Sequence, residues 1–428
     1  MRHSVVVLTT AVHMPLAFAM RTLGVEIVRA PLTTDLFHQI TEADVVLVHY
    51  WNTPVLWQAL ATELPEARYV IWSHIFGVHP PQVLNAFLLG RAAAVALTSP
   101  PPERLRSGLA GAPVIPAMVD WQRTRDVKPV AHDGFNADYI GTTNTGKIHP
   151  NFVAMMSRLQ IPGLKVRIFG GSLEPLMAQA ISDDAQPERF EVGGFVEDIG
   201  AILKTSDVYA YPLAPWTYAS CDVSLQEAML AGVPPVILPH GGIVRFVENG
   251  ENGIIAGSED EFVAAIEFLH RHPERRRRMA REARSSAEAM FDPAKHSNSL
   301  SEVLLRARLQ PRSRLLPHIA RDIPAVVLFL ISQDWEQGAA VKAVSAWLAG
   351  DTPELTAFGQ ALPDEAFRLE GGVLQWRNAV PDDALLRCWT SLWLARHDRD
   401  EDARREMIRA LDLGAPASAF AGLSMAGP

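Results

Sequence analysis

The sequence has few cysteines and no long apolar run. Only Cys221 and Cys388 occur among its 428 residues, so no disulfide framework can form and the chain suits a reducing compartment such as the cytoplasm. The most apolar stretch, residues 325–331, is far shorter than the ~20 residues that a membrane-spanning helix needs. We therefore expect a cytoplasmic protein without a membrane span, and peripheral contact with a membrane stays open.

An excess of basic residues is also missing. The chain carries 39 Lys and Arg against 48 Asp and Glu, a net charge of −9, which argues against a nucleic-acid-binding surface. A hydrophobic content of 48% provides an ample core, and the length predicts two or three domains. The start, MRHSVVVLTTAV, resembles a secretory signal, but His13 and Pro15 interrupt the apolar run and favour a strand, a turn and a helix.

The first 125 residues alternate apolar strands with helices. Continuous apolar strands separated by helices are typical of a parallel sheet that is covered on both faces, which predicts the α/β class. Ligands bind beyond the carboxyl ends of such strands, where Thr10, His49 and His74 fall. The expected strands are residues 4–9, 25–28, 44–49, 69–74, 92–98 and 113–116, and the expected helices are residues 11–23 and 53–61.

Residues 207–255 form the stretch around which the second half is organised. Strands are expected at residues 137–141 and 208–212, and a helix is expected at 223–231, where Gly232 and Pro234 end it. Ser220 and Asp222 are placed to cap that helix. The first amides of a helix are unpaired, so a loop that runs into one makes an anion site. Glu227 lies inside this helix, close enough to its start to reach a bound ligand.

This stretch resembles the donor-sugar site of retaining GT-B glycosyltransferases, family 4. The segment EAMLAGVPPV from Glu227, the pair Gly241-Gly242 and VENGENG from Val247 match the family pattern, whereas Ala219 stands where its first glutamate belongs. The resemblance implies a retaining glycosyltransferase that moves a sugar from a nucleoside diphosphate sugar to a hydroxyl acceptor, with no metal or other cofactor. It also implies two Rossmann-like domains facing a cleft. Expected parts are residues 1–125 (acceptor domain), 135–296 (donor domain), 297–312 (crossover helix) and 313–428 (helical extension). Residues 123–136 are interpreted as an interdomain linker, and residues 285–308 suit the long helix that crosses back to the first domain.

The resemblance assigns roles to the cations and the amides of the donor site. Lys147 matches the lysine that neutralises the donor diphosphate, and the amides near Asp222 and Val223 face the phosphate or the sugar. Thr142 replaces the family's arginine, so we expect another cation, Arg245, to compensate. The predicted donor-binding residues are Gly141, Thr142, Lys147, Gly171, Ser220, Asp222, Val223, Glu227 and Arg245.

Two predicted catalytic residues and two acceptor residues complete the site. His74 matches the family's strand-end histidine beside the donor sugar, and the carboxylate of Glu227 can accept two hydrogen bonds from the ribose. Asp222 either caps the helix or holds sugar hydroxyls in place of the missing glutamate. Thr10 and His49 are the predicted acceptor-binding residues.

Three alternatives remain open. Because Ala219 and Thr142 depart from the family pattern, the chain can instead be an inactive GT-B scaffold that binds a protein partner through residues 313–428. It can also be a GT-B epimerase or phosphorylase. Gly141 to Lys147 spells the phosphate-loop pattern, but Ile148 cannot bind Mg²⁺ as the required Ser or Thr would.

Residues 313–428 show helical periodicity and little strand signal. Residues 403–416 roughly resemble the second helix of a tetratricopeptide repeat, with residues 385–396 as its partner. We expect this extension to pack or to bind a partner, not to carry chemistry.

Overall fold

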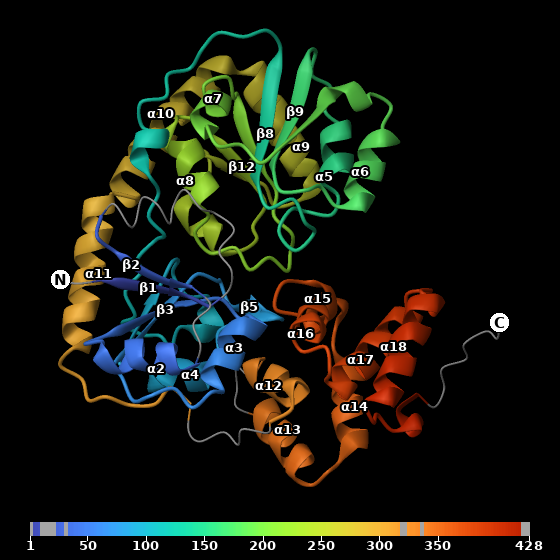
Figure 1. Cartoon of the computed structure of the whole chain (residues 1–428). Coiled ribbons are helices and arrows are strands. Elements are labelled where there is room, and N and C mark those ends of the chain that lie inside the picture. Colours follow the sequence, from blue (N-terminus) through green and yellow to red (C-terminus); the bar gives the residue numbers. More distant parts are fainter. Residues whose placement is uncertain (1–2, 9–22, 30–32, 317–322, 334–337, 421–428) are drawn as a thin grey trace. The chain divides into compact units, whose positions relative to one another are not determined.

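The computed structural model describes residues 3–8, 23–29, 33–316, 323–333 and 338–420 (Figure 1). Thr10 and residues 11–22 of the helix expected at 11–23 lie outside these ranges. The chain divides into two compact units: the first comprises residues 1–73, 80–95 and 303–428, and the second comprises residues 74–79 and 96–302. The predicted domain boundaries at residues 125, 135 and 296 stay predictions.

The strands of the first unit pair in parallel. Strand β1 (Ser4–Val7) pairs with β2 (Glu26–Arg29), and β3 (Val46–Tyr50) lies beside β4 (Tyr69–Ser73) with Val46 opposite Tyr69. A third strand, β7 (Ala94–Leu97), completes the order β3-β4-β7, and every residue of the central strand β4 is buried. The expected strand at 113–116 is wrong: only Val114 bridges to Leu97, because the flanking prolines have no N–H to donate.

Short helices and one short strand complete this α/β part of the first unit. Helix α3 begins after Thr53, whose hydroxyl accepts a hydrogen bond from the amide of Leu56 (3.5 Å), as an N-cap does. The elements are α2 (Thr33–Glu42), α3 (Pro54–Leu60), α4 (Ala86–Arg91) and β6 (Gln82–Val83). The short strand β5 (Val78–His79) belongs to the second unit.

The C-terminal extension is helical, as predicted. Helices α17 and α18 pack as a pair around a small apolar cluster that includes Cys388, Leu392 and Ala410. The helices are α12 (Ala325–Ser332), α13 (Gly338–Leu348), α14 (Thr352–Ala361), α15 (Asp364–Arg368), α16 (Val373–Ala379), α17 (Ala384–Ala395) and α18 (Asp400–Asp412), followed by a 3-10 turn (Ala417–Phe420).

Buried polar side chains join this extension to the sheet part of the first unit. The side-chain amide of Asn52 donates a hydrogen bond to the carbonyl of Ser332 (3.0 Å). The side-chain amide of Gln82 donates to the carbonyl of Glu370 (2.8 Å). Helices α12 and α16 also pack against α3. Because these amides are buried, their hydrogen bonds fix where the extension docks.

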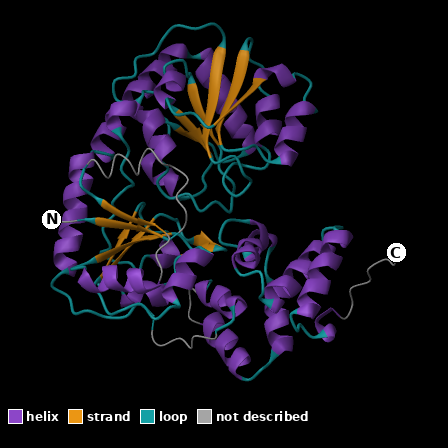
Figure 2. Ribbon diagram, viewed as in Figure 1, coloured by secondary structure: helices purple, strands orange, loops and turns teal. Residues whose placement is uncertain are grey.

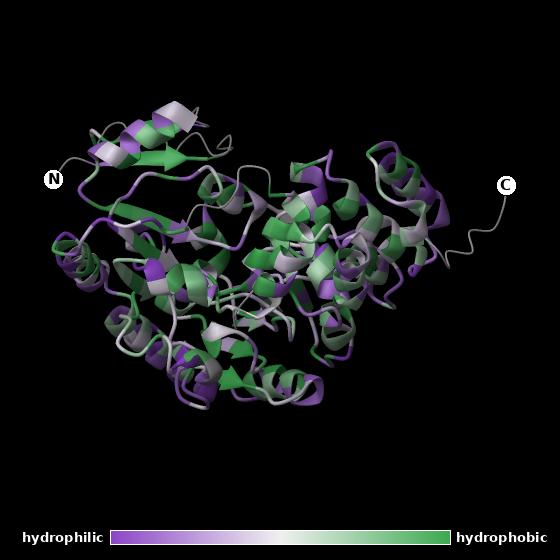
Figure 3. Ribbon diagram, turned by 90° about the horizontal axis from the view of Figure 1, so that it is seen from below, coloured by the Kyte–Doolittle hydropathy of each residue, from purple (hydrophilic) through white to green (hydrophobic). Residues whose placement is uncertain are grey.

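The second unit contains a six-stranded sheet in the order β10-β9-β8-β11-β12-β13, parallel throughout and flanked by helices (Figure 2). Most residues of these strands are buried, and strands in Figure 3 are mostly coloured as hydrophobic, as expected when both faces of a sheet are covered. The strands are β8 (Phe135–Gly141), β9 (Leu164–Gly170), β10 (Phe190–Gly194), β11 (Val208–Tyr211), β12 (Pro235–Ile237) and β13 (Ile254–Ile255). The helices are α5 (Phe152–Ser157), α6 (Pro175–Ser182), α7 (Ile199–Leu203), α8 (Val223–Leu230), α9 (Glu259–Arg271) and α10 (Pro273–Met290).

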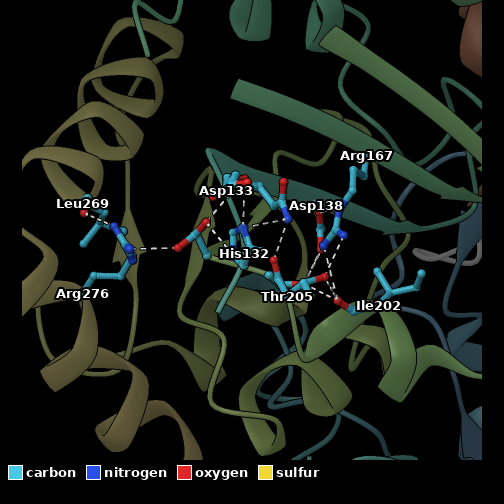
Figure 4. Close-up of polar contacts among 11 residues, drawn as sticks. His132, Asp133, Asp138, Arg167, Ile202, Thr205, Leu269 and Arg276 are labelled. Atoms are coloured by element: carbon cyan, nitrogen blue, oxygen red, sulfur yellow. Dashed lines mark hydrogen bonds and ion pairs between the residues drawn. The ribbon is translucent and has the colours of Figure 1, made fainter. Parts of the chain in front are cut away.

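A buried ion-pair network joins the middle of β8 and β9 to the residues just before β11 (Figure 4). Arg167 on β9 donates two hydrogen bonds to Asp138 on β8, at 2.7 and 2.6 Å, and a third to the hydroxyl of Thr205 at 2.9 Å. Nearby, Arg276 pairs with Asp207 at 2.8 Å. The network therefore lies inside the sheet and not at the carboxyl ends of its strands.

The predicted helix at residues 285–308 is wrong as a single element. Helix α10 ends at Met290, and a new helix, α11 (Pro293–Ala307), follows. A proline disfavours helical geometry in the residue before it, and the carboxylate of Asp292 accepts a hydrogen bond from the amide of Ala294 (2.9 Å). The crossover helix expected at 297–312 thus falls mostly within α11.

Candidate active site

The strand order of the second unit locates its ligand crevice. From β8 the chain builds outward through β9 and β10, and then crosses back to place β11 on the other side of β8. In parallel sheets of this kind, ligands bind outside the carboxyl ends of the strands where the order reverses. Here these ends carry Gly141 on β8 and Tyr211 on β11.

The loops that leave these two strands are bound to each other. The carbonyl of Lys147 accepts from the amide of Ala214 (2.8 Å), and the amide of His149 donates to the carbonyl of Pro212 (2.9 Å). The indole N–H of Trp216 donates to the carbonyl of Thr145 (2.8 Å). Helix α5 begins only at Phe152, so the loop after β8 does not run straight into a helix as a phosphate loop does.

Glycines keep the backbone open at the ends of β8 and β9. Gly141 and Gly170 are paired in register, with φ of +155° and +153°, a conformation that residues with a Cβ rarely adopt. A Cβ on Gly170 would lie 1.8 Å from the carbonyl oxygen of Gly141. Gly171 is exposed immediately after this close approach, next to Thr142, which is exposed at the end of β8.

Three stacked tyrosines lie beneath the site. The rings of Tyr139 and Tyr211 are 5.1 Å apart, and those of Tyr211 and Tyr209 are 4.7 Å apart. The hydroxyl of Tyr139 donates to the carbonyl of Thr142 (2.6 Å), and that of Tyr209 bonds the hydroxyl of Ser224 on α8 (2.9 Å). These residues position the β8 loop and the first turn of α8. The sequence pattern hinted at them only through aromatic residues at alternating strand positions.

Neither side chain that was predicted to cap α8 accepts a hydrogen bond from the start of that helix. Asp222 occupies the N-cap position, but its side chain accepts no capping hydrogen bond from the helix. The hydroxyl of Ser220 instead bonds the hydroxyls of Thr98 (2.7 Å) and Ser99 (2.8 Å). The first amides of α8, starting at Val223, therefore have no acceptor from their own cap residue and present the positive end of the helix.

Asp222 is held by two donors. Its carboxylate lies 3.0 Å from the ammonium of Lys147 and accepts a 2.7 Å hydrogen bond from the hydroxyl of Tyr211. The Lys147 ammonium also lies 5.9 Å from the centre of the Tyr218 ring. The lysine predicted to bind the diphosphate is thus next to the start of α8, as expected, and is already paired with a carboxylate.

Glu227 is a buried carboxylate on α8, with 4% of its surface exposed. Burial raises its pKa to about 7, against the attraction of Arg123, and Asp120 raises it further. The guanidinium of Arg123 lies 3.2 Å from Oε1, an oxygen that accepts no hydrogen bond from the described part of the chain. Arg123 also donates to the carbonyl of Glu197 (2.8 Å). Sequence reasoning missed Arg123, because it placed this residue in an interdomain linker.

His74 belongs to the second unit, where it is half-buried just after β4. Two residues further, the amide of Phe76 donates to the carbonyl of Tyr218 (2.8 Å), which fastens this segment to the loop that leads into α8. His74 therefore lies in the same unit as Glu227 and Lys147, as its predicted role requires.

Ala219, at the position of the missing glutamate, is 1% exposed. Its carbonyl accepts a hydrogen bond from the amide of Gly242 (2.7 Å), and a Cβ on Gly241 would lie 2.8 Å from the same oxygen. The paired glycines of the motif thus serve to pack their turn against this position.

The remaining predicted residues are less closely tied to the site. Arg245 is exposed in the 3-10 helix Gly242–Phe246 and forms no ion pair with any residue that the structure describes. His49 is in the first unit, on β3, with its ring 5.3 Å from that of Trp72. Thr10 lies outside the described residues.

Among the residues with described positions, no group of three His, Cys, Asp or Glu side chains could hold a metal ion. None of the helices described is long and apolar enough to cross a membrane.

Comparisons with known proteins agree with this geometry. Residues 139–272 match the family model described as glycosyl transferases group 1. This segment contains the end of β8, the β11 loop and all of α8. No curated protein sequence is significantly similar to the chain.

Several solved structures share the fold. HepE from Anabaena in complex with UDP has a TM-score of 0.57 at 19% identity, covering 71% of this chain and 91% of its own. The sucrose-phosphate synthase of Thermosynechococcus elongatus has a TM-score of 0.54 at 18% identity, covering 64% and 76%. A glycosyltransferase from Rickettsia africae has a TM-score of 0.55 at 14% identity, covering 72% and 91%. The chain has the GT-B fold, with a helical C-terminal region, and its second unit carries the glycosyl transferases group 1 segment.

Proposed function

We propose that this protein is a retaining glycosyltransferase that moves a sugar from a nucleoside diphosphate sugar to a hydroxyl acceptor. The observation that carries the proposal is the start of α8. Uncapped helix amides, Lys147 and the buried carboxylate of Glu227 come together at the strand reversal, inside the segment that matches the glycosyl transferases group 1 model.

Each group has a task that its chemistry supports. The α8 amides and Lys147 stabilise the negative charge that develops on the leaving diphosphate, so the transfer needs no metal. The ionised carboxylate of Glu227 accepts hydrogen bonds from the ribose. His74 contacts the donor sugar with a neutral imidazole. Since the described part of the chain offers no evident nucleophile with an activating base, we propose front-face displacement with retention, assisted by the leaving phosphate.

The donor nucleotide is best sought first among UDP sugars. HepE, which shares the fold, has been solved with UDP and with UDP-glucose. Donor hydrolysis across UDP-, GDP- and dTDP-sugars tests the proposal. We expect turnover of at least one donor and its loss in Glu227→Ala, with a melting temperature within a few degrees of the parent. A fully active Glu227→Ala protein would contradict the assignment of this residue.

An inactive scaffold is the second candidate, because the charge of Lys147 is already balanced by Asp222 and position 219 lacks a carboxylate. In that case the helices from α12 to α18, with their tetratricopeptide-like pair α17 and α18, would bind a protein partner. A chain whose melting temperature is unmoved by every nucleotide sugar would favour the scaffold. Two free, buried cysteines suit the cytoplasm as its location.

A further inference from the structure

We propose that Asp222 binds hydroxyl groups of the donor sugar once the diphosphate has drawn Lys147 away from it. This inference rests on the proposed function. Two consequences follow from this role of Asp222. The donor sugar is neutral and rich in hydroxyl groups, and the intact donor binds more tightly than the nucleoside diphosphate product.

The surroundings of Asp222 satisfy both of its carboxylate oxygens. Its side chain is 10% exposed and that of Lys147 is 14% exposed, so both charges are largely withdrawn from water. One carboxylate oxygen faces the Lys147 ammonium (3.0 Å), and the other accepts from the hydroxyl of Tyr211 (2.7 Å). A carboxylate this buried needs a donor for each oxygen, and here neither donor is a helix amide.

The arrival of a diphosphate disturbs this pairing. The Lys147–Asp222 pair has no net charge, so an anionic diphosphate must compete with Asp222 for the ammonium. When Lys147 turns to the phosphate, the Tyr211 hydroxyl still donates to one carboxylate oxygen of Asp222. The other carboxylate oxygen loses the ammonium that it faced. Hydroxyl groups of a sugar attached to that diphosphate are donors of the right kind to replace the ammonium.

This change of partner separates substrate from product. A nucleoside diphosphate without its sugar leaves one oxygen of Asp222 unpaired beside a phosphate of the same charge. An uronic acid would place a second carboxylate against Asp222. Both ligands lose binding free energy relative to a neutral donor, because unpaired buried charge and close like charges are costly.

Position 219 offers no other carboxylate for this task. Ala219 is buried, and its carbonyl accepts from Gly242 in a turn whose glycines leave little room. Asp222, three positions further on, is the acidic side chain between Ala219 and α8.

Calorimetric titration of the full chain tests the inference. UDP, GDP, dTDP and the neutral hexose conjugate of each are titrated separately into the unaltered protein. The nucleotide that this protein binds is then used with the variants. We expect the conjugate to bind more tightly than the free diphosphate. In Asp222→Asn, freeing Lys147 should tighten binding of the free diphosphate by about tenfold, while the conjugate gains less, so that the preference shrinks.

A matched control is Asp260→Asn, which removes a charge of the same kind from an exposed pair with Arg158 (2.5 Å) in the same unit. It should leave the ratio of the two dissociation constants unchanged. A second readout needs no variant: the unaltered protein should bind the uronate of the same nucleotide at least about tenfold more weakly than the neutral conjugate.

These experiments distinguish failure of the proposed role of Asp222 from failure of the proposed glycosyltransferase function. If nucleotides bind but Asp222→Asn leaves the ratio unchanged, or the uronate binds as tightly as the neutral sugar, the role of Asp222 is overturned and the glycosyltransferase assignment stands. If no nucleotide or nucleotide sugar binds the unaltered protein, the proposed function itself is overturned.

Discussion

At the residue scale, Glu227 couples the candidate site to pH. Its pKa rises from an ordinary 4.5 to about 7 because burial on α8 outweighs the attraction of Arg123. The folded protein therefore keeps a proton that the unfolded chain releases between these pH values. Folding stability from this group is present at low pH and is lost as pH rises toward 7.

Urea denaturation at pH 5 and pH 8 measures this coupling. The free energy of unfolding of Glu227→Gln, relative to the parent, should increase between the two pH values by up to about 3 kcal/mol, because glutamine has no proton to lose. The comparison within one pH cancels other titrating groups. A difference between the two proteins that is equal at both pH values would contradict the buried, partly unpaired carboxylate.

Gly170 is the second residue whose role can be isolated. Gly170→Ala places a Cβ 1.8 Å from the carbonyl of Gly141 and forces a non-glycine residue to φ near +153°, so β8 and β9 must separate. We expect a loss of about 2 kcal/mol or more in the free energy of unfolding. The adjacent Gly171→Ala is the control, since its Cβ meets only the Thr143 hydroxyl at 4.0 Å. Equal stability of the two variants would contradict the close strand approach.

At the element scale, the sheet of the second unit depends on the pair between β8 and β9. Arg167→Met would leave Asp138, which is 0% exposed, without its bidentate partner. We expect a loss of about 3–5 kcal/mol in chemical denaturation, the range for breaking a buried pair. Lys165→Met on the same strand removes an exposed pair with Glu191 (2.8 Å) and should cost about 1 kcal/mol or less. Similar losses from both variants would contradict the buried network.

Elements were predictable from sequence wherever local pattern decides the structure. Apolar runs predicted β4, β8 and β11, and Gly232 with Pro234 correctly indicated the end of α8. Where long-range contacts decide, the sequence misled. Asp222 looks like a cap, but Lys147 and Tyr211, distant in sequence, engage its oxygens instead.

Arg123 was missed for the same reason. It sits in a polar stretch without periodicity, and only the path of the folded chain brings it to Glu227. The helix expected at 285–308 failed for a local reason instead. Pro293 disfavours helical geometry in the residue before it, so one helix ends and another starts there.

At the scale of the whole molecule, the C-terminal helices are part of the first unit. Removing residues 317–428 would take away the carbonyls that Asn52 and Gln82 bond, and would expose the face of α3 that α12 and α16 cover. We expect the truncated chain to melt at a lower temperature or to aggregate, because buried amides without partners and uncovered apolar surface are both unfavourable. A truncated chain with unchanged melting temperature would show that the extension is dispensable for folding.

The central claim is that the carboxyl ends of β8 and β11 bind a nucleoside diphosphate sugar. A crystal structure of the chain with the nucleotide sugar that it hydrolyses tests this most directly. The account predicts phosphate oxygens within hydrogen-bond distance of the Lys147 ammonium and the Val223 amide, with the ribose hydroxyls on Glu227. A nucleotide sugar bound elsewhere, with the Lys147–Asp222 pair intact, would contradict it.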